Sequence, residues 1–286
     1  MPISGNRLFL PIQKSIFPCV QTLHKTSKSL YKTFTDTVFV GKKIVYLPSC
    51  QSTNDIAAEK IQQGNGTDGL LIVTSQQTAG RGQRGNSWET QADQNLTFSL
   101  ILRPSFLLAH EQFQLNMAIS MGIHDFLSQF NLPDLCVKWP NDIYCKSKKM
   151  GGILIENFLK GNQISHSIIG IGLNINQQAF VHPNAVSLSQ LTGANYQLPL
   201  LMEEIASCLE KRYLSLRQSG TAKLKQHYLS KLYWYQEERT FQDLRNKGVP
   251  IEFQGQLLGI GKQGQLIVEK DQKLEEFNFQ EIKFLA

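Results

Sequence analysis

The sequence lacks several patterns that would assign the protein to a common class. No apolar run in the 286 residues approaches the ~18 residues needed to cross a bilayer. The five cysteines show no C-x-x-C spacing, and no pair among the six histidines has the spacing of metal ligands. The phosphate-binding pattern G-x-x-x-x-G-K-[S/T] is also missing. These absences argue against a membrane protein, a disulfide scaffold, a metal centre built from protein ligands and P-loop chemistry.

Acidic residues are scarce near the N-terminus. Residues 1–40 contain five Lys/Arg and one acid, Asp36, so they contribute +4 of the net charge of +6, and the rest of the chain contributes +2. The basic charge therefore does not indicate a nucleic-acid surface. Residues 1–37 show no sustained periodicity, and we expect a basic extension outside the fold: a transit-like leader, a loose tail or the product of an early start codon. The cysteines are odd in number and show no paired spacing, which favours a reducing compartment. We therefore expect a cytoplasmic protein, with organelle targeting left open.

Hydrophobic periodicity predicts an α+β fold. Over residues 38–236 we expect a mixed β-sheet flanked by helices, and over residues 237–286 a small barrel of antiparallel strands, because short β-rich runs there alternate with turn signals. The predicted strands of the main domain cover residues 43–47, 70–75, 96–102, 136–139, 153–157 and 166–173, and the predicted helices cover residues 53–63, 115–130, 200–216 and 221–230.

The most distinctive motif is a loop rich in glycine and arginine, Q-T-A-G-R-G-Q-R-G-N-S-W, at residues 77–88. Glycines let backbone N–H groups approach an anion, and Arg81 and Arg84 supply guanidinium groups that bind carboxylate or phosphate. G-R-G-Q-R-G matches the dinucleotide fingerprint, but a polar stretch and a strand follow it instead of a helix. The loop therefore predicts a ligand that is anionic and, because of Trp88, aromatic. A mobile surface loop is the structural alternative.

Three further motifs follow along the chain. K-W-P-N-D, residues 138–142, ends a strand in a tight turn and places Asp142 where it can hold Mg²⁺ against phosphates; an Asx turn with a packed tryptophan is the alternative. K-K-M-G-G, residues 148–152, brings two glycines into an apolar strand, with Lys149 directed inward and Lys148 solvated. G-I-G-L-N, residues 170–174, suggests a flat ligand such as adenine lying on the strand, or else a β-bulge.

These four motifs together resemble the catalytic domain of the biotin protein ligases (biotin–acetyl-CoA-carboxylase ligase, holocarboxylase synthetase) from about residue 43 to the C-terminus. The resemblance implies a biotin/lipoate ligase-like domain with an SH3-like C-terminal barrel. It also implies that ATP and Mg²⁺ are used to form biotinyl-5′-AMP, from which biotin passes to a lysine of a carboxyl carrier domain. We expect no DNA or membrane partner, and edge strands that could pair two subunits. A lipoate or octanoate ligase, a biotin-sensing regulator and a non-catalytic binding protein are the alternatives.

Residue roles follow from the resemblance alone. Gln83 and Asn86 stand where arginines are common in the family, so adenylate retention is expected to be looser unless Arg84 substitutes. The lid is expected on other grounds: residues 177–198 form a long polar stretch with Phe180 and Tyr196, which could order over the adenylate. Lys149, Arg81 and Asp142 would be catalytic, with Asp142 also holding Mg²⁺. The implied biotin contacts are Ser52, Thr53, Asn54, Gln77, Arg81, Gly82, Gln83, Lys149 and Gly151, and the implied ATP or adenylate contacts are Trp88, Lys138, Asn141, Asn174 and Arg84.

Overall fold

The computed structural model describes residues 31–246 and 249–285, without the side chain of Arg84. The predicted N-terminal extension lies outside the described residues up to position 30. Its last residues pack on the main body: Phe34 is 3% exposed. The carboxylate of Glu210 accepts hydrogen bonds from the backbone N–H groups of Val38, Phe39 and Val40. The packed chain therefore begins before residue 38.

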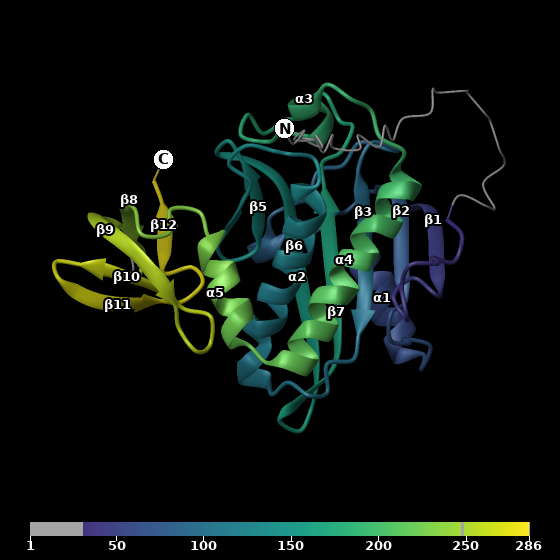
Figure 1. The fold of residues 1–286 in the computed structure, drawn as a ribbon, viewed down its shortest axis with the longest axis horizontal. Helices are drawn as coiled ribbons and strands as arrows, with labels where there is room; N and C mark the ends of the chain where they lie inside the picture. The colour runs from purple at the N-terminus through teal and green to yellow at the C-terminus, as the bar shows by residue number, and fades with distance from the viewer. Residues whose placement is uncertain (1–30, 247–248, 286) are drawn as a thin grey trace, which may run out of the picture. The chain divides into compact units, whose positions relative to one another are not determined.

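A seven-stranded mixed sheet forms the centre of the larger part of the molecule (Figure 1). The strand order is β1-β2-β3-β7-β6-β5-β4; β1 and β2 are parallel, and every other neighbouring pair is antiparallel. The predicted mixed sheet is therefore confirmed. Its strands are β1 (Ile44–Cys50), β2 (Leu71–Gln77), β3 (Leu96–Leu102), β4 (Cys136–Lys138), β5 (Asp142–Cys145), β6 (Lys148–Lys160) and β7 (Gln163–Leu173).

Helices cover both faces of this sheet, which is why β3 is buried along its whole length. Leu71 and Val73 belong to the larger hydrophobic core with residues of α2 and α4, whereas Ile72 points to the opposite face and packs near Ala57 of α1. Gly122 allows α2 and α4 to approach, because an added Cβ would lie 3.0 Å from the Cα of Leu209. The helices are α1 (Thr53–Gln62), α2 (Gln112–Ser128), α3 (Leu188–Thr192), α4 (Leu198–Ser219) and α5 (Ala222–Ser230), with 3-10 turns η1 (Gln83–Gly85) and η2 (Ala109–Glu111).

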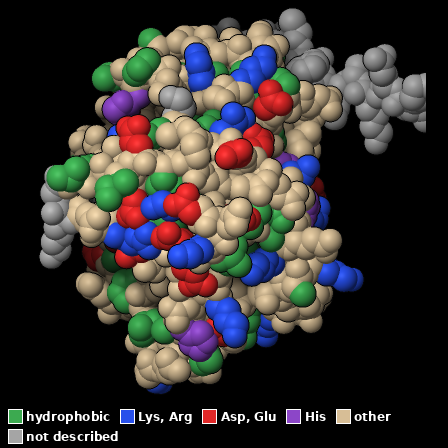
Figure 2. Space-filling model, turned by 90° about the vertical axis from the view of Figure 1, so that its left-hand side faces the viewer, with side chains coloured by type: hydrophobic (Ala, Val, Ile, Leu, Met, Phe, Trp, Pro, Cys, Tyr) green, Lys and Arg blue, Asp and Glu red, His purple; other side chains and the backbone are tan. Residues whose placement is uncertain are grey.

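The C-terminal strands form a second, five-stranded antiparallel sheet in the order β11-β10-β9-β8-β12. The predicted antiparallel β domain is present, but the predicted closure into a barrel is not found: β11 and β12 lie at opposite ends of the described sheet and do not pair. Charged groups of both signs are intermixed on the face seen in Figure 2. The strands are β8 (Glu238–Asp243), β9 (Ile251–Ile260), β10 (Leu266–Lys270), β11 (Lys273–Phe277) and β12 (Ile282–Phe284).

The tryptophan of K-W-P-N-D connects the two sheets. Trp139 is buried, its Nε1 donates to the carbonyl oxygen of Gly264 at 2.9 Å, and its ring lies 5.1 Å from that of Phe279. The packed-tryptophan interpretation is therefore correct for this residue. None of the helices in the described ranges is both long and apolar enough to cross a membrane.

The buried imidazole of His124 in α2 makes the stability of the fold depend on pH. Burial, together with the charge of Lys231, lowers its pKa from 6.5 to about 4. The unfolded chain therefore takes up this proton at a higher pH than the folded chain. The stabilisation is complete above pH 6.5 and is lost as the pH falls towards 4, by about 2–3 kcal/mol.

We expect His124→Gln, which cannot be protonated, to show a smaller loss of stability between pH 7 and pH 4.5 than the wild-type protein. Urea unfolding at both pH values measures the difference. His182→Gln, at an exposed position, is the matched control and should keep the wild-type pH dependence. Equal pH dependence in the His124 variant and the wild type would contradict the assignment.

Candidate active site

A polar pocket lies where the start of α1 and the glycine–arginine loop meet the first half of β6 and the end of β7. Its volume is about 480 Å³, including the space open to solvent. Gly152, Gly170 and Gly172 contribute to its floor. The predicted site residues that line it are Ser52, Thr53, Asn54, Gln77, Arg81, Gly82, Gln83, Trp88, Asn141, Asp142 and Lys149.

The parallel β1–α1–β2 unit explains why Ser52, Thr53 and Gln77 meet. β1 and β2 run in the same direction, so the start of α1 after β1 lies beside Gln77 at the end of β2. Ser52 is the N-cap of α1, in extended conformation, and its side chain makes no capping hydrogen bond. Its buried hydroxyl is therefore available to a ligand in the pocket.

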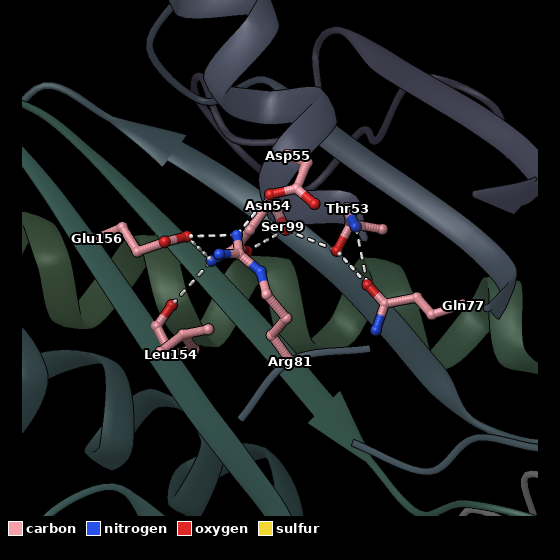
Figure 3. Close-up of polar contacts among 8 residues, drawn as sticks. All are labelled: Thr53, Asn54, Asp55, Gln77, Arg81, Ser99, Leu154 and Glu156. Carbon is pink, nitrogen blue, oxygen red and sulfur yellow. Dashed lines mark hydrogen bonds and ion pairs between the residues drawn. The ribbon is translucent and has the colours of Figure 1, made fainter. Parts of the chain in front are cut away.

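A hydrogen-bond network fixes this end of the pocket (Figure 3). The Oε1 atom of Gln77 accepts from the backbone N–H of Thr53 at 2.8 Å and lies 3.2 Å from its hydroxyl oxygen. The hydroxyl of Ser99, on β3, lies 2.7 Å from that of Thr53 and 2.6 Å from Oδ1 of Asn54. Because Oε1 of Gln77 is engaged, its Nε2 remains as a donor at the pocket.

Arg81 forms ion pairs with two carboxylates. Its Nη2 lies 2.5 Å from Oδ1 of Asp55 and 3.4 Å from Oε2 of Glu156. The side chain of Arg81 is 46% exposed, so solvent weakens both pairs, and an anionic ligand can replace them at little cost. The surrounding loop is held by backbone bonds from Trp88 N to Gly80 O and from Gly82 N to Asn86 O.

Trp88 and Asn54 explain the two glycines of β7. A Cβ on Gly172 would lie 2.3 Å from the Trp88 indole, and a Cβ on Gly170 would lie 2.4 Å from Oδ1 of Asn54. The glycines therefore admit side chains of the protein, and the predicted flat ligand is not needed to explain them. A β-bulge is also excluded, because β7 pairs with β3 and β6 in continuous register at both positions. The indole Nε1 of Trp88 is buried without a hydrogen-bond partner among the described residues.

Lys149 and Asp142 form the second charged pair of the pocket. Lys149 Nζ lies 2.7 Å from Oδ1 of Asp142, and 5.8 Å from the centre of the Trp88 ring. The backbone of Lys149 is fixed by hydrogen bonds with Asn184 and Val186. The neighbouring Lys148 is exposed and does not line the pocket. Asp142 begins β5, so K-W-P-N-D connects two strands of the sheet.

Four predicted residues are not among those that line the pocket. The side chain of Arg84 lies outside the described set. Lys138 Nζ lies over the rings of Tyr144 and Phe284, at 4.7 and 5.2 Å from their centres, and burial lowers its pKa. Its predicted contact with the nucleotide stays a prediction. The other two are Gly151, where an added Cβ would lie 2.3 Å from Leu173, and Asn174, which is buried and donates to the backbone oxygen of Val186 at 3.3 Å.

The interpretation of the sequence missed Glu156, Asp55 and Ser99. Glu156 ends the stretch K-M-G-G-I-L-I-E at residues 149–156, and a charged residue directly after an apolar run is a signal that could have been used. Ser99 is fully buried in β3, and its position in an alternating strand gave no indication of its partners.

The predicted lid at residues 177–198 is anchored at both ends. Gln177 is buried, and its Oε1 accepts from Asn95 Nδ2 at 2.5 Å. Ser187 caps α3 by accepting from the backbone N–H of Gln190. Backbone hydrogen bonds also join Asn184 and Val186 to Lys149 of β6, so the part that could move is limited to about residues 178–183, which include the exposed Val181.

The pocket has a donor set that fits one type of metal ion. Within the described ranges, no group of three or more His, Cys, Asp or Glu side chains is arranged to hold a metal. Asp142 is the single carboxylate among the pocket-lining residues. Mg²⁺ keeps several waters and uses one or two carboxylates with substrate phosphates, so Asp142 fits Mg²⁺ that arrives with a nucleotide.

Gly172→Ala tests the position of Trp88. The new methyl group would overlap the indole, so we expect Trp88 to leave the floor of the pocket and the tryptophan emission to shift to longer wavelength. Gly259→Ala on β9 is the matched control, because its Cβ would have no neighbour nearer than 3.9 Å. An unchanged emission spectrum in Gly172→Ala would show that Trp88 does not lie on β7.

Comparison with known proteins agrees with this geometry. Residues 46–174 match the model of the biotin/lipoate A/B protein ligase family. The bifunctional ligase/repressor BirA of Bacillus spizizenii is 30% identical over 258 residues, which cover 88% of this chain and 77% of that protein. The biotin–[acetyl-CoA-carboxylase] ligase of Mycobacterium tuberculosis is 27% identical over 59% of this chain and 63% of that protein.

A solved structure supports the same fold. Biotin protein ligase from Aquifex aeolicus, in complex with biotin and ATP, superimposes with a TM-score of 0.70 at 24% identity, over 85% of this chain and 99% of that one. On the strength of the 30% identity over most of both chains, this protein belongs to the biotin protein ligases.

Proposed function

We propose that the protein is an ATP-dependent biotin–[biotin carboxyl carrier protein] ligase. It forms biotinyl-5′-AMP from biotin and ATP and then transfers biotin to one lysine of a carboxylase carrier domain, as in acetyl-CoA carboxylase. The observation that carries this proposal is the convergence of Lys149, Arg81 and the Thr53–Gln77 network in one pocket. The biotin and ATP bound to the Aquifex aeolicus relative support the same substrates.

The polar end of the pocket suits the ureido ring of biotin. A urea presents two N–H donors beside a carbonyl acceptor, and such groups need partners when they are buried. Ser52, Thr53 and Gln77 supply hydroxyl and amide groups there. The ring of lipoate carries no hydrogen-bonding group of this kind, so binding it would leave these side chains unpaired. This end of the pocket therefore favours biotin over lipoate or octanoate.

The cationic end suits the first half-reaction. A carboxylate of biotin must attack the α-phosphate of ATP, and the two groups repel each other. Arg81 and Lys149 can exchange Asp55, Glu156 and Asp142 for substrate anions, which would lower that repulsion and orient the groups. Mg²⁺ held by Asp142 would supply further positive charge to the phosphates.

The second half-reaction requires a neutral lysine on the carrier. With a pKa near 10.4, deprotonating it at pH 7 costs about 4.6 kcal/mol. Desolvation at the interface and a proton acceptor must supply part of this. Asp142, in the pocket, and a phosphate oxygen of the adenylate are the two acceptors that the chemistry allows. Residues 178–183 would shelter the reactive anhydride from water.

Trp88 is the proposed contact for adenine. Its indole lies in the pocket over Gly172, and its Nε1 is buried without a partner among the described residues. An aromatic face beside Lys149 suits the base of a nucleotide whose phosphates lie near that lysine. Gln83 contributes an uncharged amide to the pocket where the family often has an arginine. The looser retention of the adenylate that we expect from this difference stays a prediction.

The proposal is tested by incubating the protein with ATP, Mg²⁺, a carrier domain and either biotin or lipoate, and then weighing the carrier. We expect the carrier to gain one biotinyl group with biotin and to stay unmodified with lipoate. Modification by lipoate alone would favour the lipoate ligase. Binding of biotin without any modification would favour a sensing or non-catalytic protein.

Lys149→Ala should lower the rate of adenylate formation by roughly 10- to 150-fold, because a charge-assisted hydrogen bond contributes about 1.5–3 kcal/mol. Lys148→Ala is the matched control, since this neighbouring lysine is exposed and outside the pocket. ATP–pyrophosphate exchange measures the first half-reaction without a carrier. A large loss in Lys148→Ala with normal activity in Lys149→Ala would reverse the assignment.

A further inference from the structure

Glu156 on β6 joins three parts of the site without lining the pocket. Its Oε2 accepts from Nδ2 of Asn54 at 2.5 Å and lies 3.4 Å from Nη2 of Arg81. Asn54 belongs to α1, and Arg81 belongs to the glycine–arginine loop. Figure 3 shows the carboxylate directed at both partners. A change at Glu156 therefore reaches the pocket through Asn54 and Arg81.

Glu156 determines the orientation of the Asn54 amide. A carboxylate only accepts hydrogen bonds, so the NH₂ end of Asn54 must face it, with a second, longer contact to the carbonyl oxygen of Leu154 at 3.5 Å. The oxygen end then faces the Ser99 hydroxyl at 2.6 Å. The amide is 3% exposed and fits only because Gly170 has no side chain. Both ends of the Asn54 amide are therefore engaged by groups of the protein.

Ser99 transmits this orientation to Thr53. Its hydroxyl has one proton and lies within 2.7 Å of two oxygens, Oδ1 of Asn54 and Oγ1 of Thr53. An amide oxygen cannot donate, so the Ser99 proton must point to Asn54. The short contact between the two hydroxyls then requires the Thr53 proton. The Thr53 hydroxyl then has no proton left for Gln77, so the 3.2 Å contact between Thr53 Oγ1 and Gln77 Oε1 is the weakest of the set. Gln77 Oε1 keeps its hydrogen bond from the backbone N–H of Thr53.

The result is a fixed pattern of polarity at the pocket. The Thr53 hydroxyl donates to Ser99, so its lone pairs are free to accept from a ligand N–H. Gln77 Oε1 is engaged, so its Nε2 is free to donate to a ligand carbonyl. An acceptor beside a donor matches the N–H and C=O of a urea or a cyclic amide.

We propose that Glu156 is a positioning residue that sets this polarity, through Asn54 and Ser99, so that Thr53 accepts from a ureido N–H. The assignment rests on the proposed function, because it takes biotin as the ligand. Loss of the carboxylate frees the Asn54 amide to rotate by half a turn. Its NH₂ group would then face Ser99, and the direction of the hydrogen bonds from Asn54 through Ser99 to Thr53 would reverse. Glu156 thereby contributes to biotin specificity without touching biotin.

Calorimetry of biotin binding tests this series of hydrogen bonds. The variants are Glu156→Leu, Glu156→Gln, Ser99→Ala and the Glu156→Leu/Ser99→Ala double variant. We expect about a tenfold rise in Kd for Glu156→Leu and for Ser99→Ala. Glu156→Gln keeps an oxygen for Asn54 and should stay within threefold of the wild type. ATP affinity should change less than twofold in all of them. Glu59→Leu, at an exposed glutamate of α1, is the matched control and should bind biotin normally.

The double variant separates a relay from general damage. If the two residues act in one chain, it should bind about as weakly as either single variant, whereas independent effects would multiply to about a hundredfold. Biotin methyl ester, which lacks the anion that Arg81 would bind, should show the same loss in Glu156→Leu.

A multiplied effect in the double variant, or wild-type affinity in Glu156→Leu, would overturn the inference. If Glu156→Leu does not fold, Ser99→Ala still breaks the chain, and a loss below threefold in that variant would be decisive against it. A wild-type protein that does not bind biotin would instead refute the proposed function.

Discussion

The close approach of α1 to the bare surface of β7 is the constraint on which the site depends. Asn54 reaches β7 only because Gly170 has no Cβ, and this contact brings the first turn of α1 down to the sheet. Thr53 is then adjacent to Gln77 on β2 and to Ser99 on β3. A larger residue at position 170 would lift the helix and separate groups that come from three distant parts of the sequence. The glycines thus position the protein's own polar groups.

Among the described side chains that line the pocket, both cations are paired with carboxylates of the protein itself. Arg81 is paired with Asp55 and Glu156, and Lys149 is paired with Asp142. This arrangement avoids an unpaired charge beside the partly buried floor, and since the pairs are partly exposed, they are weak enough to be exchanged. The free energy of binding an anionic substrate is therefore the difference between the ion pairs that it forms with Arg81 and Lys149 and the ion pairs that it replaces. This difference is smaller than the number of cations suggests.

Much of the fold could be read from the sequence, because the strands and helices depend on local signals. The alternating pattern placed β3 at residues 96–102, and the resemblance to the ligases selected eleven residues that line one pocket. What failed depends on contacts between distant segments. Nothing local shows that Phe34 is buried, that Gly172 faces Trp88, or that the last strands do not close. The sequence likewise gives no sign that the ammonium group of Lys138 lies over the rings of Tyr144 and Phe284.

In the proposed mechanism, recognition and chemistry take place at opposite ends of the pocket, and Glu156 connects the two ends. One end would recognise biotin by the polarity of its hydrogen bonds, which must be fixed because a rotated Asn54 amide would reverse it. At the other end, Arg81 and Lys149 would exchange their ion pairs for substrate anions. Glu156 contacts Asn54 at the first end and Arg81 at the second. An anion that draws Arg81 away would leave the bond between Glu156 and Asn54 in place, so recognition would persist while the charges rearrange.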